Sequence, residues 1–449
     1  MRTIWAIRHK VELWHRVWLS VAIRQSRLGL IDLPNRGLEQ LTRLLETDRV
    51  TKYEEETAAK LEKAIEHDLV AQLMGFKKTL PDEIAPFIHC GLTSSDVEDL
   101  ADLHLIDESI LSLRGQLNSL FEEFNRFIAH HAKDPVLGRT HLQPAVPTTF
   151  GYRFLVYFQE MAMAAMRLEV TRLDAFFIPR VPGGAVGTGE SEIFLSMVAG
   201  NLPETRITNP QATGQTYPRT QDLRMLQALD ELAACCLKMF QDIRLMQMES
   251  VLQEPTLGSR IGSSAMPGKA NPILSEKGSG LARMLHGHVQ TAWEMASSQM
   301  LERSLDDSSV RRFILPESFL LASELISLVM TILTTSSLNL DLAKKEVHYH
   351  WRSWLPSRVL TLLRASGIDV MNQDLISVSM STTSPEHFLF DARQRWPCSK
   401  LENLSMLMTQ FGPLYVPEAL IDRTTFTSKG ILDRWKRTIS YQSGELPYA

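Results

Sequence analysis

The feature that most constrains the fold is a long apolar stripe early in the second hundred residues. From Leu103 onward, apolar residues fall at 103, 106, 110, 113, 117, 120, 124 and 127. An alternation of three and four residues, kept up over about seven turns, is typical of a helix in a bundle or coiled coil. Such a helix must pack its stripe against other helices.

Four further segments have long helical periods, and they run over about 152–177, 220–252, 275–300 and 316–335. Helices of this length indicate an extended bundle. They cannot all bury their stripes within one subunit, so we expect a homo-oligomer. A chain of 449 residues also exceeds one hydrophobic core. We predict an all-α protein of three helical domains: an N-terminal domain (1–101), a central long-helix bundle (102–345) and a small C-terminal domain (346–449).

Composition excludes several classes of protein. The net charge is −5, from 47 basic and 52 acidic residues that are mixed along the chain. This distribution does not favour nucleic acid as a partner. The four cysteines match no zinc pattern and indicate free thiols in a reducing compartment. The N-terminus lacks the apolar core of a signal peptide. The most apolar run (319–334) contains Glu324 and falls short of a membrane span, so we expect a cytoplasmic protein.

The breaks between the helical patterns are rich in Gly, Pro, Ser and Thr, and we interpret them as loops. They are HCGLTSSD (89–96), GRTHLQPAVPTTFG (138–151), IPRVPGGAVGTGE (178–190), NPQATGQTYPRT (209–220) and LGSRIGSSAMPGKANP (257–272). Chemistry often lies on loops that rigid elements position. We therefore expect catalytic side chains in these segments.

The most specific of these strings is GSSAMPGKANPILSE (262–276). Taken alone it could be a polar loop with a helix cap at Ser275. It resembles the GSSxMPxKxN signature of the aspartase/fumarase superfamily at every fixed position. GRTHLQPAVPTTFG resembles a second conserved region, in which the histidine after the threonine serves in acid–base catalysis. TSSD (93–96) can cap a helix, and it resembles the region that binds a substrate carboxylate through free N–H groups.

Four details resemble the adenylosuccinate lyase branch of that superfamily: Glu66-His67-Asp68, TSSDVED, PTTFG and LERSLDDSSVRRFILPE (301–317). In that branch, the last stretch binds the nucleotide phosphate. The resemblance implies this role for Ser308 and Arg312, with Arg303 nearby. Three features differ: the initial Arg-Tyr pair is missing, MPGK replaces MPHK, and the chain from about 345 matches no member.

The resemblance implies β-elimination across a C–N bond of a succinyl substrate, with release of fumarate. The reaction needs a base for a weakly acidic C–H, an acid for the leaving nitrogen and donors for the carbanion. The resemblance gives Ser263 as the base and His141 as the acid, with His67 as second choice. The other predicted roles are carbanion stabilisation by Lys269 and Asn271, orientation of His141 by Glu276, and substrate contact by Thr93, Ser94, Ser95, Asp96, Thr140, Gln215, Ser264 and Met266.

The sequence is compatible with several functions. The first is adenylosuccinate cleavage to AMP and fumarate in purine synthesis. Others are a lyase for a smaller N-substituted aspartate or succinate, a cycloisomerase, and an inactive scaffold. The resemblance implies a homotetramer with shared active sites and a small anionic substrate. No metal cluster or nucleotide-cofactor fingerprint is visible, so no metal or cofactor is expected.

Overall fold

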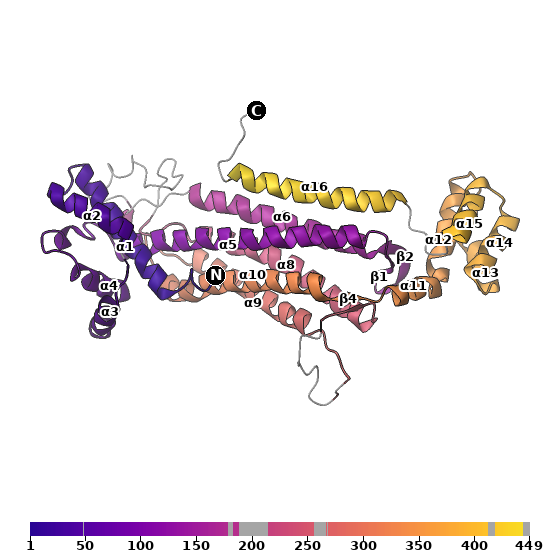
Figure 1. The fold of residues 1–449 in the computed structure, drawn as a ribbon, viewed down its shortest axis with the longest axis horizontal. Helices are drawn as coiled ribbons and strands as arrows, with labels where there is room; N and C mark the ends of the chain where they lie inside the picture. The colour runs from indigo at the N-terminus through magenta and orange to yellow at the C-terminus, as the bar shows by residue number, and fades with distance from the viewer. Residues whose placement is uncertain are drawn as a thin grey trace. The chain divides into compact units, whose positions relative to one another are not determined.

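The structure is a computed structural model that describes residues 1–47, 49–177, 183–187, 214–255, 266, 268–411 and 418–442. It is helical through most of its length (Figure 1). The helices are α1 (Ile7–Arg27), α2 (Asn35–Thr47), α3 (Lys52–Ile65), α4 (Asp68–Lys77), η1 (Ala85–Phe87), α5 (Ser94–His130), α6 (Phe150–Phe177), η2 (Gly184–Val186), α8 (Thr220–Met248), α9 (Ile273–Ser297), α10 (Asp306–Thr335), α11 (Leu340–Tyr349), α12 (Trp351–Arg364), α13 (Asn372–Ser381), α14 (Pro385–Arg395), α15 (Ser399–Phe411) and α16 (Glu418–Gln442).

The long helices confirm the all-α prediction. Each of the five predicted long patterns coincides with one helix among α5, α6, α8, α9 and α10. The predicted start of the last one was wrong, because α10 begins at Asp306 and contains Pro316 in its interior. The acidic residues Asp306 and Asp307 occupy its first turn, where the positive end of the helix dipole stabilises their negative charge. A proline removes one backbone hydrogen bond, but it does not end this helix.

The chain divides into two compact units, and each of α5, α6, α8, α9 and α10 contributes to both. The first unit comprises Met1–Leu117, Ala164–Ala234 and Gly280–Leu325. The second unit comprises Asn118–Met163, Cys235–Ser279 and Ile326–Ala449. The domain bounds expected from sequence stay a prediction.

The N-terminal helices of the first unit share an apolar core with the start of α5. Trp18, Leu19 and Phe76 are fully buried in it. Further along, Leu226 of α8, the α9 residues Ala292 and Met295, and α10 form a separate apolar cluster.

Buried ion pairs join α5, α8 and α10 inside the first unit. Arg219 binds Asp99 at 3.0 Å and also Asp307. Arg311 binds Asp222 at 2.7 Å and Asp102 at 3.1 Å. The whole network is balanced, with four cations and four carboxylates: Lys10, Arg219, Arg303 and Arg311 against Asp99, Asp102, Asp222 and Asp307.

The second unit contains a β-hairpin where the sequence predicted a loop. Strands β1 (Pro135–Thr140) and β2 (Gln143–Thr149) pair antiparallel, with Leu137 opposite Pro147 and Arg139 opposite Pro144. Prolines argue against central strands because they donate no hydrogen bond. Both strands of a two-stranded ribbon are edge strands, so these prolines are tolerated. A second short ribbon pairs β3 (Leu252–Gln253) with β4 (Ser337–Leu338).

The C-terminal part of the second unit forms a small helical core and then returns to α5. Trp351, Trp354 and Phe388 are buried among α11 to α15. By contrast, α16 packs on α5, where the Trp435 indole N–H donates to Asn118 at 2.5 Å. The Trp435 ring also contacts Phe121 edge-on, with centroids 5.2 Å apart.

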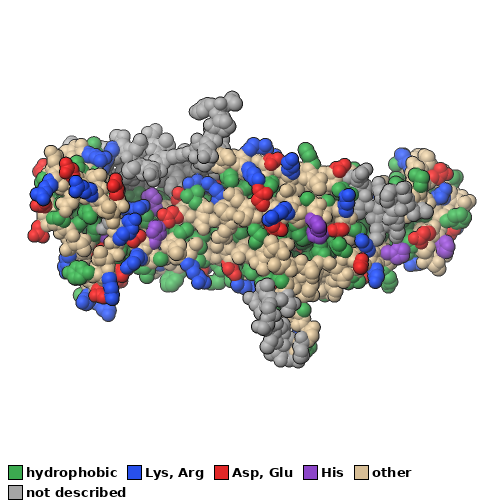
Figure 2. Space-filling model, viewed as in Figure 1, with side chains coloured by type: hydrophobic (Ala, Val, Ile, Leu, Met, Phe, Trp, Pro, Cys, Tyr) green, Lys and Arg blue, Asp and Glu red, His purple; other side chains and the backbone are tan. Residues whose placement is uncertain are grey.

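Among the described residues, α10 is the one helix long and apolar enough to cross a membrane, with a mean hydropathy of 1.7 over its most apolar window. Within that window 56% of the residues are buried inside the protein. This is the burial of a core helix. On the face shown in Figure 2, acidic and basic side chains are interspersed, as the mixed sequence charges predicted.

The buried network generates a stability prediction. Asp99→Ala leaves two buried guanidinium groups short of a partner, so we expect a loss of about 3–5 kcal/mol. The matched control is Glu56→Ala, which removes only the exposed Lys52–Glu56 pair at 3.9 Å. It should cost less than about 0.5 kcal/mol. Unfolding by urea, followed by circular dichroism, measures both. Equal midpoints for the two variants would contradict a stabilising role for the network.

Candidate active site

The TSSD segment forms the beginning of α5 in the first unit. The Asp96 carboxylate accepts from the Thr93 N–H at 2.7 Å and from the Thr93 hydroxyl at 3.0 Å. In return, the Asp96 N–H donates to the Thr93 hydroxyl at 3.3 Å. The other carboxylate oxygen accepts from the Gly183 N–H at 2.9 Å. Asp96 is fully buried, so this predicted substrate contact serves to hold the segment in place.

Ser94 and His67, both predicted site residues, meet at this point. Their side chains lie 3.4 Å apart, measured from Ser94 Oγ to His67 Nε2. His67 also caps α4, where its Nδ1 accepts from the Val70 N–H at 3.5 Å. Because Nδ1 accepts, the neutral ring carries its proton on Nε2. His67 therefore presents an N–H donor toward the start of α5.

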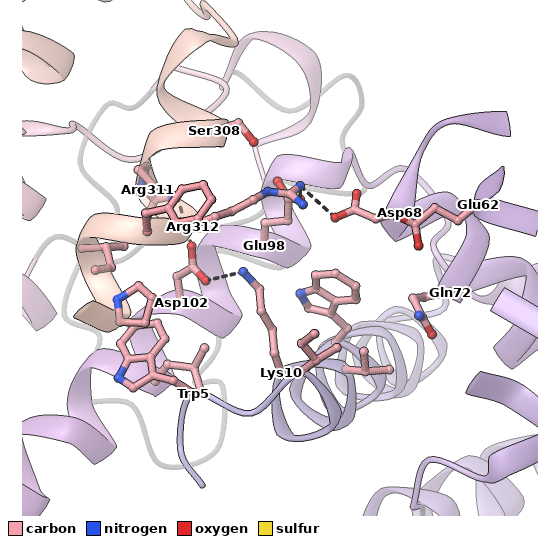
Figure 3. Close-up of a pocket in the computed structure, with 17 residues that line it drawn as sticks. Trp5, Lys10, Glu62, Asp68, Gln72, Glu98, Asp102, Ser308, Arg311 and Arg312 are labelled. Carbon is pink, nitrogen blue, oxygen red and sulfur yellow. Dashed lines mark ion pairs between the residues drawn. The ribbon is translucent and has the colours of Figure 1, made fainter. Parts of the chain in front are cut away.

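A cavity of about 400 Å³ in the first unit contains two of the predicted phosphate-binding residues, Ser308 and Arg312 (Figure 3). Its walls come from α1, α3, α4, α5 and α10. Its charged residues are Lys10, Glu62, Asp68, Glu98, Asp102, Arg311 and Arg312. Three aromatic side chains, Trp5, Trp14 and Phe313, provide apolar surface.

Arg312 lies between two carboxylates in this cavity (Figure 3). Its Nη2 is 2.8 Å from Asp68 Oδ2 and 3.7 Å from Glu98 Oε1. Burial raises the pKa of Glu98 to about 7, and the nearby carboxylates of Asp102 and Asp68 add to the effect. The Glu98 carboxyl group, half protonated at neutral pH, therefore faces Arg312, the residue predicted to bind the phosphate.

Arg303 and Gln215, the other predicted contacts in the first unit, lie beside the buried network. The Arg303 guanidinium donates to Asp307 at 2.5 Å. The Gln215 N–H donates to the Glu302 carbonyl at 3.1 Å. The Gln215 bond connects the segment before α8 to the segment before α10, and the Arg303 bond ties that second segment to the first turn of α10.

In the second unit, His141 occupies the tip of the β1–β2 hairpin. Thr140 pairs with Gln143, so His141 and Leu142 are the two central residues of the turn. Their φ angles are 52° and 61°. Positive φ at both positions is the type I′ pattern, which normally takes Asn-Gly. Such strain in residues with side chains is found at functional sites. His141 is exposed at this tip.

The described end of the signature segment leads into α9. Glu254 is buried, and its carboxylate accepts from the N–H groups of Leu274 and Ser275 at 2.9 Å each. It also accepts from the Ser275 hydroxyl. The negative charge of Glu254 thus caps the start of α9. Just before that cap, Lys269 is exposed and Asn271 is half-buried.

Among the predicted residues of the second unit that the structure describes, the Lys269 N–H donates to the Met266 carbonyl at 3.0 Å. Within the described part of the chain, neither the His141 ring nor the Glu276 side chain has a hydrogen-bond partner. Met266 is exposed, and Thr140 pairs with Gln143 in the ladder. Ser263 and Ser264 lie outside the described residues, and Ser95 is buried at the start of α5.

Sequence reasoning missed three acidic residues: Asp68 and Glu98 beside Arg312, and Glu254, which caps the start of α9. Asp68 directly follows His67, so its position was visible in the motif. Glu98 and Asp102 are four residues apart on α5, a spacing that places them on one helix face. Glu254 had no signal, because it lies outside the motif that it caps. Over the described residues, no group of three or more His, Cys, Asp or Glu side chains is arranged to hold a metal ion.

Comparison with known proteins places this arrangement in a family. A family model described as "Lyase" matches residues 37–287. Adenylosuccinate lyase from Saccharomyces cerevisiae is 34% identical over 344 residues, which are 74% of this chain and 70% of the yeast enzyme. Adenylosuccinate lyase from Aquifex aeolicus is 32% identical over 370 residues, which are 82% of each chain. The chain belongs to this lyase family. The resemblance to the aspartase/fumarase superfamily is therefore confirmed.

Solved structures show that the shared fold of this lyase extends beyond the part covered by those relatives. The 3-carboxy-cis,cis-muconate lactonizing enzyme from Pseudomonas putida has a TM-score of 0.79 and 17% identity, over 98% of this chain and 97% of that enzyme. A fumarate lyase from Mesorhizobium sp. has a TM-score of 0.76 over 94% of this chain and 96% of that protein, at 18% identity. The C-terminal helices, which resembled no member by sequence, thus belong to the common fold.

The strained hairpin tip generates a second stability prediction. Leu142→Gly should stabilise the lyase by up to about 1 kcal/mol, because glycine adopts positive φ without strain. Val146→Gly is the matched control on the same hairpin, since Val146 is 58% exposed and Leu142 is 64% exposed. It should destabilise by about 0.5–1 kcal/mol. Thermal unfolding compares them, and an equal loss in both variants would exclude strain at the tip.

Proposed function

We propose that this lyase cleaves adenylosuccinate to AMP and fumarate. The observation that carries the proposal is the extended identity to adenylosuccinate lyases, at 34% over 344 residues for the yeast enzyme. A cavity that holds Ser308 and Arg312 in one unit supports it. The substrate is a small anion, and the reaction is a β-elimination across a C–N bond.

The proposed reaction starts with removal of a proton from the carbon next to a succinyl carboxylate. The electron pair of that C–H bond forms the C=C bond of fumarate as the C–N bond breaks. The leaving nitrogen takes a proton from the general acid, so AMP leaves neutral at that nitrogen. Donors aimed at the charge of the intermediate are the largest catalytic term in such chemistry.

We assign these roles by the matched motifs. Ser263 is the base, Lys269 and Asn271 stabilise the carbanion, and His141 is the general acid. Support for His141 is its exposed position on a strained turn, free of hydrogen bonds within the described chain. His67 is the alternative acid, because its Nε2–H points toward Ser94. Histidine suits the role since its ordinary pKa is near neutral.

The start of α5 is the proposed site for one succinyl carboxylate. Free N–H groups at the first turn of a helix favour an anion. Thr93 and Ser94 are both half-buried there. Asp96 fixes the geometry of this turn through its bonds to Thr93.

We further propose a cytoplasmic homotetramer whose active sites combine residues of several subunits. Exposed positions on α9 support it, at Gly280, Met284 and Gly287. Their spacing of four and three residues places them on one face, and a side chain added at either glycine would meet nothing within 4 Å. Exposed Met163 and Val170 lie seven residues apart on α6. A facing helix could cover both stripes.

A second candidate function is a fumarate-releasing lyase for a smaller N-substituted aspartate. The pairing of Arg312 with Asp68 favours it, because that arginine is already neutralised. A substrate without a phosphate would not compete for Arg312. The AMP experiment that follows separates the two functions.

If the nucleotide function is correct, wild-type protein should release fumarate from adenylosuccinate and bind AMP. Arg312→Ala removes charge-assisted hydrogen bonds worth roughly 1.5–3 kcal/mol each. AMP binding should then weaken by about one to two orders of magnitude. Calorimetry measures the binding, with Arg303→Ala as a comparison variant. Absence of AMP binding and of adenylosuccinate cleavage in the wild type would overturn the assignment.

Shared active sites predict complementation between inactive variants. Ser263→Ala and His141→Ala should each lose at least about three orders of magnitude in turnover. Subunit exchange between them should form hybrid tetramers with some intact sites, and activity should reappear. Each variant mixed with itself is the control. A monomer by light scattering, or no recovered activity after proven exchange, would contradict the proposed assembly.

A further inference from the structure

Any phosphate that binds Arg312 must compete with carboxylates that already contact it. Asp68 and Glu98 approach the same guanidinium nitrogen from α4 and α5 (Figure 3). The Arg312 side chain is half exposed, so a ligand can reach it from the cavity. Its availability therefore depends on the charge of these two acids.

The two acids are not equivalent, because Asp68 has other partners that stabilise its charge. Its Oδ1 accepts from the Leu69 N–H at 2.8 Å. Asp68 is also the first residue of α4, at the positive end of the helix dipole. Asp68 is thus held at the start of α4, where it pairs with Arg312 at 2.8 Å.

Glu98 lacks such stabilising partners. Among the described residues its carboxylate accepts no hydrogen bond, and Arg312 is its one ion-pair partner, at 3.7 Å. Like charges face it from Asp102 on its own helix and from Asp68 on α4. Two cations could offset them, but both are engaged by Asp102: Lys10 of α1 at 3.0 Å and Arg311 of α10 at 3.1 Å.

Glu62 of α3 lines the same cavity and adds another acidic group. Glu62 is not among the groups that shift the pKa of Glu98: burial raises the pKa of Glu98 to about 7, and the charges of Asp102 and Asp68 add to the effect. The charge of Glu98 can therefore change near neutral pH.

We infer that Glu98 determines the affinity of this site for phosphate, since its carboxylate competes for Arg312 and phosphate binds best when Glu98 has taken up a proton. The inference rests on the proposed nucleotide function. It adds a residue that acts through Arg312 and links substrate binding to pH.

The sign of the pH dependence follows from the raised pKa. Below about pH 7 Glu98 is mostly neutral, and a phosphate then competes for Arg312 with Asp68 alone. Above pH 7 Glu98 is charged and repels the ligand. The phosphate itself is already a dianion there, because its second pKa is about 6. From pH 7 to pH 8.5, AMP affinity of the wild type should therefore fall by about tenfold.

The test is calorimetric titration of AMP into the full-length wild type and into Glu98→Gln. Binding to Glu98→Gln should be roughly 20–30-fold tighter than to wild type at pH 8.5, and within about twofold at pH 6.5. At pH 8, repeating the titration in two buffers of different ionisation enthalpy measures proton uptake. The wild type should take up nearly one proton, and Glu98→Gln none. Glu62→Gln is the matched control, and it should behave like the wild type.

The outcomes separate this inference from the function on which it rests. If AMP binds to the wild type with no proton uptake and with the same pH profile as Glu98→Gln, the role of Glu98 is wrong while the nucleotide function stands. If Glu62→Gln tightens binding as much as Glu98→Gln, general repulsion explains the effect and the specific competition is overturned. If no protein binds AMP at any pH, the nucleotide function itself fails. The wild-type pH profile remains decisive even if Glu98→Gln does not fold.

Discussion

Buried pairing of arginine and aspartate is the interaction on which the first unit depends. Removing charged groups from water is costly, so such a cluster is retained only where the charges and hydrogen bonds are satisfied. Here Arg219 and Arg311 are both nearly inaccessible, and both contact Asp99 of α5. The same helix carries Asp96 at its start and Glu98 on the cavity wall. A shift of α5 would disturb the network, the proposed carboxylate site and the cavity together.

The second unit positions its candidate residues by a different means. His141 sits on a turn whose backbone is unfavourable for its side chain. Pairing along the ribbon offsets that strain, as does the Arg153 guanidinium, which donates to the Leu137 carbonyl at 2.8 Å. The Glu254 carboxylate accepts hydrogen bonds from the backbone N–H groups at the start of α9 and so holds that start in place. Both devices position exposed residues, His141 and Lys269, whose side chains have no hydrogen-bond partner among the described residues.

Sequence predicted the parts of this protein that follow from periodicity or from a motif. The stripe from Leu103 predicted α5, and GSSAMPGKAN predicted the family. It did not predict the hairpin, because Pro144 and Pro147 argue against strands unless both strands are edges. It also missed the pairing of Arg312 with Glu98, since that contact joins residues more than two hundred positions apart. Local patterns carry no information about which distant charge a side chain will meet.

The motif residues divide into two groups, according to whether their side chains have hydrogen-bond partners within the described chain. Asp96 and Arg303 have partners within the chain, so their polar atoms hold the segments that contain them. His141 and Lys269 have exposed side chains with no such partner among the described residues. A group that binds or protonates a substrate must keep its hydrogen-bonding capacity for that substrate. The hydrogen bonds of this chain therefore favour a positioning role for Asp96 and Arg303, and they support the proposed roles of His141 and Lys269.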